Sequence, residues 1–110
     1  MKDLLIVTIL FIIIDCVSGI MQAIKNKEIN STKMRNGFFN KSAFFLVIIL
    51  SILCDYAMQY IDIGLNLHLV KIVCGYVITT EIISIIENIG KLNTSILPQK
   101  IKDMFFKLKG

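Results

Sequence analysis

The sequence predicts an all-α membrane protein, with three transmembrane helices and a short C-terminal helix in a single domain over residues 1–110. Composition is the first reason: 55% of the residues are hydrophobic and 18% are charged, against about 45–50% and 25% in soluble domains. A soluble domain of this length has too little interior to bury so much apolar surface. The second reason is that the apolar residues form three long stretches, each close to the roughly 20 residues that cross a bilayer as a helix.

The first expected span covers residues 4–24 and is interrupted by Asp15 near its middle. The second covers residues 42–61, and the third, which is the least apolar, covers residues 65–86. Residues 1–18 also allow a cleaved signal peptide. Asp15 disfavours that alternative, because a cleavage region requires apolar or small residues at such a position.

The connections between these spans differ in length and charge. Residues 25–41 form a polar segment with five basic residues, whereas residues 62–64 form a turn without Lys or Arg, which makes the second and third spans antiparallel neighbours. A linker after the third span leads to Pro98, a residue that favours a helix start. The basic tail that follows predicts a short amphipathic helix, because its apolar residues recur at helical spacing: Ile101, Met104, Phe105 and Leu108.

Basic residues near the ends of spans stay on the cytoplasmic side of a membrane. Ten of the twelve basic residues lie in the segment 25–41 or in the tail 91–110, so the N-terminus is expected outside and the C-terminus inside. The net charge of +4 then attracts anionic lipid and is not a nucleic-acid footprint. The expected inner-leaflet anchors are Lys25, Lys27, Lys33, Arg35, Lys41, Lys100, Lys102, Lys107 and Lys109.

Nothing in the sequence has the pattern of a catalytic, cofactor or metal site. The chain has one His, and its three Cys fall in three different spans among apolar neighbours, where a thiol behaves as a small hydrophobic group. We therefore expect no enzyme activity, no cofactor and no metal.

The informative residues are the acids inside the spans. A carboxylate near the middle of a bilayer costs about 2.5–3.5 kcal/mol and usually faces a helix bundle or a water-filled cavity. Asp15, Ser18, Gly19 and Gln22 follow the spacing i, i+3, i+4, i+7, so one face of the first span is polar or small. Gly19 and Ala23 add a small-xxx-small pair that permits close helix packing.

Polar faces recur on the other two spans. Asp55 and Lys71 lie at one depth, about 9 Å from the outer end of their antiparallel helices, which predicts an ion pair between them. The candidates for oligomer or pore contacts are Asp15, Ser18, Gly19, Gln22, Ala23, Asp55, Lys71, Glu81, Ser84, Glu87 and Asn88. The alternative is ordinary packing of a three-helix bundle around buried hydrogen bonds.

Several strings of residues resemble the toxin-secretion and phage-lysis holin family. The most specific is residues 81–88, which follow the pattern Glu-x-x-Ser-x-x-Glu-Asn. Residues 14–19 and the Leu-Pro pair before the basic tail are also similar to that family. Further matches are Ala23, Lys25, Ser31, Gly37, Lys41 and Asp55. The chain departs from the pattern at Asn40, where a basic residue is common, and in the linker before Pro98, which lacks a glycine.

This resemblance implies a small phage-type protein that accumulates in the bacterial inner membrane and forms homo-oligomers. Its oligomers would open lesions that release an endolysin or a toxin. Three other functions stay open: an ion or proton channel that uses Asp15 and Glu81, an adaptor in a larger membrane complex, and a holin inhibitor of the same fold.

Overall fold

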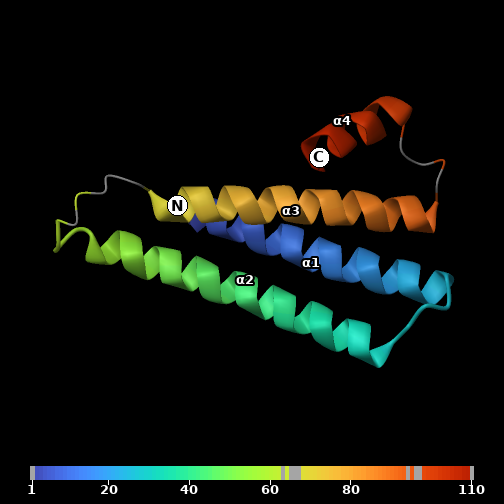
Figure 1. The fold of residues 1–110 in the computed structure, drawn as a ribbon, viewed down its shortest axis with the longest axis horizontal. Coiled ribbons are helices and arrows are strands. Elements are labelled where there is room, and N and C mark those ends of the chain that lie inside the picture. The colour runs from blue at the N-terminus through green and yellow to red at the C-terminus, as the bar shows by residue number, and fades with distance from the viewer. Residues whose placement is uncertain (1, 63, 65–67, 94, 96–97, 110) are drawn as a thin grey trace.

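A computed structural model describes residues 2–62, 64, 68–93, 95 and 98–109, and these residues form four α-helices and no strand. The helices are α1 (Lys2–Lys25), α2 (Ser31–Ala57), α3 (Leu69–Leu92) and α4 (Gln99–Lys109). The first three alternate in direction, so α1 and α3 run the same way (Figure 1). Each of these three is long and apolar enough to cross a membrane, which confirms the predicted all-α architecture with three spans.

Local capping defines the α1–α2 connection. Lys27, two residues after the last residue of α1, adopts the left-handed conformation, with φ of 55°. The N–H of Lys27 bonds the carbonyl of Ile24, and the N–H of Glu28 bonds that of Ala23, a Schellman-type helix end. Asn30 then caps α2, because its side-chain oxygen accepts hydrogen bonds from the backbone N–H groups of Thr32 and Lys33 at 2.8 and 3.3 Å. Residues 31–41, which hydropathy assigns to a polar connection, are thus the first turns of α2.

Asp55 caps the start of α3, at the opposite end of the bundle. Its two carboxylate oxygens accept hydrogen bonds from the backbone N–H groups of Leu69 and Val70, each at 2.9 Å. Lys71, one residue further on, is exposed. The predicted ion pair between Asp55 and Lys71 is therefore wrong, because the free N–H groups at the start of α3 occupy the carboxylate.

The core lies mainly between α1 and α3. Their buried residues recur at steps of three and four, which is one helical face on each: Thr8, Ile12, Asp15 and Ser18 on α1, and Val70, Cys74, Val77, Glu81 and Ile85 on α3. α2 buries only Ile48 and Ser51 in the described part of the chain. Ile12, Ile48 and Val77 meet in one apolar cluster. α1 and α3 therefore form the main pair, and α2 rests on it through a narrower contact.

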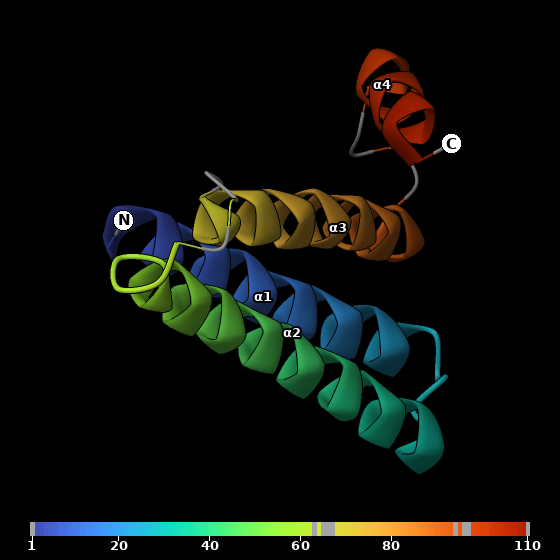
Figure 2. The same cartoon turned by 60° about the vertical axis from the view of Figure 1, so that its left-hand side comes forward.

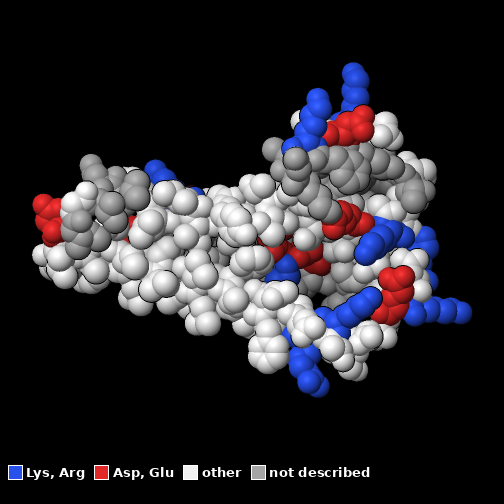
Figure 3. All heavy atoms as spheres, in the orientation of Figure 1, with Lys and Arg blue, Asp and Glu red and all other residues white. Residues whose placement is uncertain are grey.

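The outer surface of the bundle is apolar. Large side chains such as Leu46, Leu53 and Ile72 are more than half exposed, and Figure 3 shows a broad uncharged region with charged side chains gathered mostly at the end near the α1–α2 connection. Several hydroxyl groups within the helices donate to their own backbone; the Thr79 hydroxyl, for example, donates to the carbonyl of Gly75 at 2.8 Å. Such a surface is suited to lipid, which offers no hydrogen bonds.

α4 lies beyond α3, on the side away from α2 (Figure 2). The side chains at positions 102, 105, 106, 108 and 109 lie outside the described part of the structure. The apolar face expected for this helix from Phe105 and Leu108, and the anchoring roles of Lys102 and Lys109, thus stay predictions.

Candidate functional site

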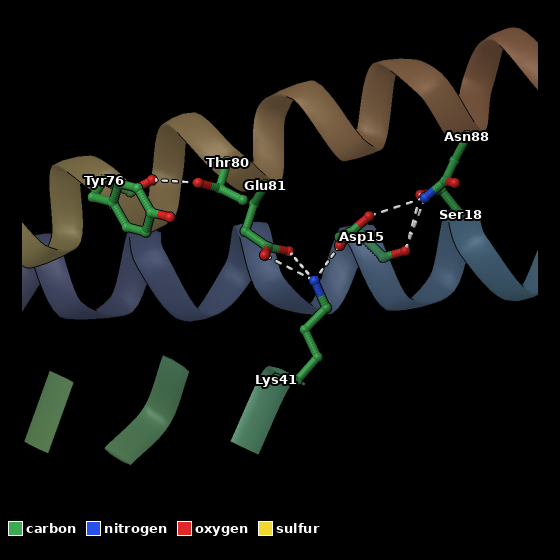
Figure 4. Close-up of polar contacts among 7 residues, drawn as sticks. All are labelled: Asp15, Ser18, Lys41, Tyr76, Thr80, Glu81 and Asn88. Atoms are coloured by element: carbon green, nitrogen blue, oxygen red, sulfur yellow. Dashed lines mark hydrogen bonds and ion pairs between the residues drawn. The ribbon is translucent and has the colours of Figure 1, made fainter. Parts of the chain in front are cut away.

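A polar network joins the three long helices in the interior of the bundle. The Lys41 ammonium on α2 bonds both carboxylate oxygens of Glu81 on α3, at 2.8 and 2.6 Å. The same ammonium pairs with the carboxylate of Asp15 on α1 (Figure 4). The side chain of Glu81 is fully buried, that of Asp15 is 8% exposed, and that of Lys41 is 20% exposed. We call these three residues the ion triad.

Helix direction and length bring the ion triad together. Because α1 and α3 run the same way, Asp15 and Glu81 lie at one level, each at least about 15 Å from the nearest end of its helix. Lys41 lies about 15 Å into α2, which runs in the opposite direction. Its flexible four-carbon stem reaches across to both acids.

Asn88 extends the network along α1 and α3. Its side-chain amide donates to the carboxylate of Asp15 at 2.9 Å and to the hydroxyl of Ser18 at 3.1 Å. A Cβ added at Gly19 would lie 3.5 Å from this amide nitrogen, which is ordinary van der Waals contact, so the amide packs against α1 at Gly19. Among the described residues, every buried side-chain nitrogen and oxygen has a hydrogen-bond partner.

The electrostatics of the ion triad depend on all three helices being in place. With every group ionised, two carboxylates share one ammonium and the formal charge is −1. Charges taken out of water are tolerable only while each is paired and hydrogen-bonded, and removing one partner of a buried pair costs about 3–5 kcal/mol. Lys41 therefore holds α2 to the α1–α3 pair, and displacing α2 would leave Asp15 and Glu81 without their counter-charge.

The structure brings together some of the residues predicted as oligomer or pore contacts. Asp15, Ser18, Gly19, Glu81 and Asn88 meet in the network. Other candidates are half-buried on the same helices: Gln22, Ala23, Ser84 and Glu87. The remaining two, Asp55 and Lys71, lie at the opposite end of the bundle.

Sequence reasoning places Lys41 among the inner-leaflet anchors, whereas in the structure it is the centre of the ion triad. The available signal is Asn30, a capping residue that starts α2 well before the apolar stretch. Asn26 was also missed: its amide donates to the carbonyl of Lys91 at 3.4 Å, beside a hydrogen bond from Lys25 to the carbonyl of Leu92. These two contacts tie together the ends of α1 and α3.

Fold and network together define a multi-pass membrane protein whose three membrane-spanning helices carry a buried, internally satisfied polar cluster. The whole chain, residues 1–110, matches the sequence model of the bacteriophage holin family. The chain belongs to that family, which confirms the resemblance seen in the sequence and makes it a holin-type membrane protein of phage lysis. No curated protein and no solved structure matches it.

Proposed function

We propose that this holin oligomerises in the bacterial inner membrane and forms non-specific lesions that release an endolysin or a toxin. Membership in the holin family supports permeabilisation as the general function. The observation that supports the mechanism is the ion triad, which places three ionisable groups inside a bundle whose outer surface is apolar. Such groups in a membrane usually mark a water-filled path or a helix contact.

In this proposal the structure is the closed state, in which one chain satisfies its own polar groups. To open, α2 leaves the α1–α3 pair, and Asp15 and Glu81 then face water or the Lys41 of a neighbouring copy. α2 is the helix that moves because it buries least against the others. Since the same ionic contacts form within a chain and between chains, the closed and open states differ little in free energy. A higher density of chains in the membrane then raises the population of the open state.

The proposed orientation follows from the charged end of the bundle. Lys25, Lys27, Lys33, Arg35 and Lys91 all lie where α1 and α3 end and α2 begins, the charge-rich end in Figure 3. By the positive-inside rule this end faces the cytoplasm, and the N-terminus faces outward. α4 then lies on the cytoplasmic side.

Release of solutes of graded size from vesicles tests the function. Purified protein is reconstituted into vesicles loaded with a fluorescent ion indicator, small dextrans, large dextrans and a folded protein. A holin releases all of them once a threshold protein density is reached. Release of ions alone would instead indicate a channel, and no release at all would indicate an adaptor or an inhibitor; each of these results contradicts the proposal.

A matched pair of variants ties that release to the ion triad. E81Q removes a fully buried carboxylate of the network, whereas E28Q removes an exposed one in the α1–α2 connection. We expect E81Q to change the threshold density for dextran release and E28Q to leave it unchanged. Equal thresholds for E81Q and the unsubstituted chain would remove the ion triad from the mechanism.

A further inference from the structure

An open groove separates α1 from the first turns of α2. The two helices diverge toward their connection (Figure 1), and the space between them has a volume of about 560 Å³, within the roughly 300–1,000 Å³ of ligand pockets. Its walls are mainly apolar and include Ile20, Ile29, Met34 and Phe38. Phe38 is 68% exposed, so a large aromatic face in this groove is left uncovered by the chain.

Charged residues of both signs line the groove. Lys33 of α2 and Lys91 of α3 are exposed, and Glu28 is the exposed acid beside them. Deeper in the groove lie Asp15 and Lys41, which are already paired with each other. The exposed part therefore carries a net positive charge at the level where the helices end, beside walls that are mainly apolar.

We propose that this groove binds one anionic phospholipid, with an acyl chain along the apolar walls and the phosphate between Lys33 and Lys91. Basic pockets between transmembrane helices on the cytoplasmic side suit such headgroups. The site requires the proposed cytoplasmic orientation and does not require lesion formation. A lipid in this position covers the open side of Lys41 and keeps water from the ion triad.

Two glycines supply a steric test with a matched control. A Cβ added at Gly37, which lines the groove, meets no atom within 4 Å. The same is true of a Cβ added at Gly75 of α3, which does not line it. G37L therefore adds a bulky side chain to the groove wall without a clash at its Cβ, whereas G75L adds the same side chain to a helix elsewhere on the bundle.

The absence of Trp from the sequence allows a site-specific optical probe. F38W places a single Trp in the groove, and Y76W places one at a similarly exposed position of α3 outside it. Each protein is reconstituted in phosphatidylcholine vesicles that contain a small, equal fraction of brominated phosphatidylglycerol or brominated phosphatidylcholine. We expect the phosphatidylglycerol to quench F38W several-fold more strongly than the same fraction of phosphatidylcholine, and Y76W to show no such preference.

Charge substitutions in the F38W protein separate a bound lipid from general attraction to the surface. K33Q and K91Q should each lower the preference for phosphatidylglycerol about fivefold. R35Q removes an exposed charge of α2 that does not line the groove and should lower it much less. G37L should abolish the preference, and G75L should retain it.

Equal losses for K33Q and R35Q would overturn the proposal, because only surface attraction would then be present. A preference that survives G37L would also overturn it. Quenching that depends on protein density and not on lipid charge would show that a second copy fills the groove, which contradicts a lipid site. A preserved lipid preference together with no dextran release would refute the proposed holin activity and leave the lipid site standing.

Discussion

Substitution of Lys41 by Met is expected to destabilise the packed bundle strongly. Met keeps most of the length of the side chain but removes the ammonium that bonds Asp15 and both oxygens of Glu81. Two carboxylates, one of them fully buried, then face each other without a counter-charge. The expected cost is about 3–5 kcal/mol, a large share of the 5–15 kcal/mol that typically holds a domain folded.

Cys74 provides the measurement, because its side chain is completely buried in α3. With C16A and C54A removing the other two thiols, the rate of maleimide labelling in detergent reports how often the bundle opens. We expect K41M to accelerate labelling roughly a hundredfold or more. R35M, which removes an exposed charge of the same helix, should change the free energy of opening by less than about 0.5 kcal/mol.

A neutral network separates the effect of charge from that of packing. Adding D15N and E81Q to K41M removes all three charges and should restore most of the protection of Cys74. If K41M labels as slowly as R35M, the ion triad does not hold α2, and the reasoning fails. If K41M labels fast and the neutral triple variant labels equally fast, Lys41 acts by packing alone, which also refutes the electrostatic argument.

Three further substitutions test other parts of the structure with the same labelling assay. D55A removes the acceptor of two N–H groups at the start of α3 and should cost about 0.5–2 kcal/mol, whereas D62A, at an exposed acid of the connection, should cost little. N88L deprives Asp15 and Ser18 of a donor and should cost about 1–3 kcal/mol; a cost near zero would show that the amide contacts are dispensable. G19A should be tolerated or slightly stabilising, because the added Cβ makes an ordinary 3.5 Å contact with Asn88 and Ala favours a helix; loss of Cys74 protection would mean that α1 and α3 pack closer than the structure has them.

The three helices and the polar faces of α1 and α3 could be predicted because both are encoded in the side chains themselves. Apolar length predicts a span wherever lipid is the solvent. The spacing of Asp15, Ser18 and Gly19 predicts that they share one face of α1. That face packs on Asn88 of α3, and its Asp15 shares the Lys41 ammonium with Glu81 of α3.

The role of Lys41 could not be predicted from hydropathy, because hydropathy follows the apolar stretch and α2 begins ten residues before Lys41, at Ser31. A capping residue sets that start, and the charged first turns then carry Lys41 into the bundle. The Asp55 interaction was missed for a related reason. Equal depth in the membrane relates side-chain charges only, whereas α3 begins at Leu69 with unpaired N–H groups that compete for the carboxylate.

Cross-linking of helix pairs in vesicles tests the proposed opening most directly. In a background with all three native cysteines replaced by Ala, I48C/V77C joins α2 to α3 within the apolar cluster, and I12C/V77C joins α1 to α3 within the same cluster. Each pair is closed with a cleavable bis-maleimide before dextran release is measured. The account predicts that the α2–α3 cross-link blocks release until it is cleaved, while the α1–α3 cross-link permits it. Release that continues through the α2–α3 cross-link, or that stops with either one, would contradict the movement of α2 away from an intact α1–α3 pair.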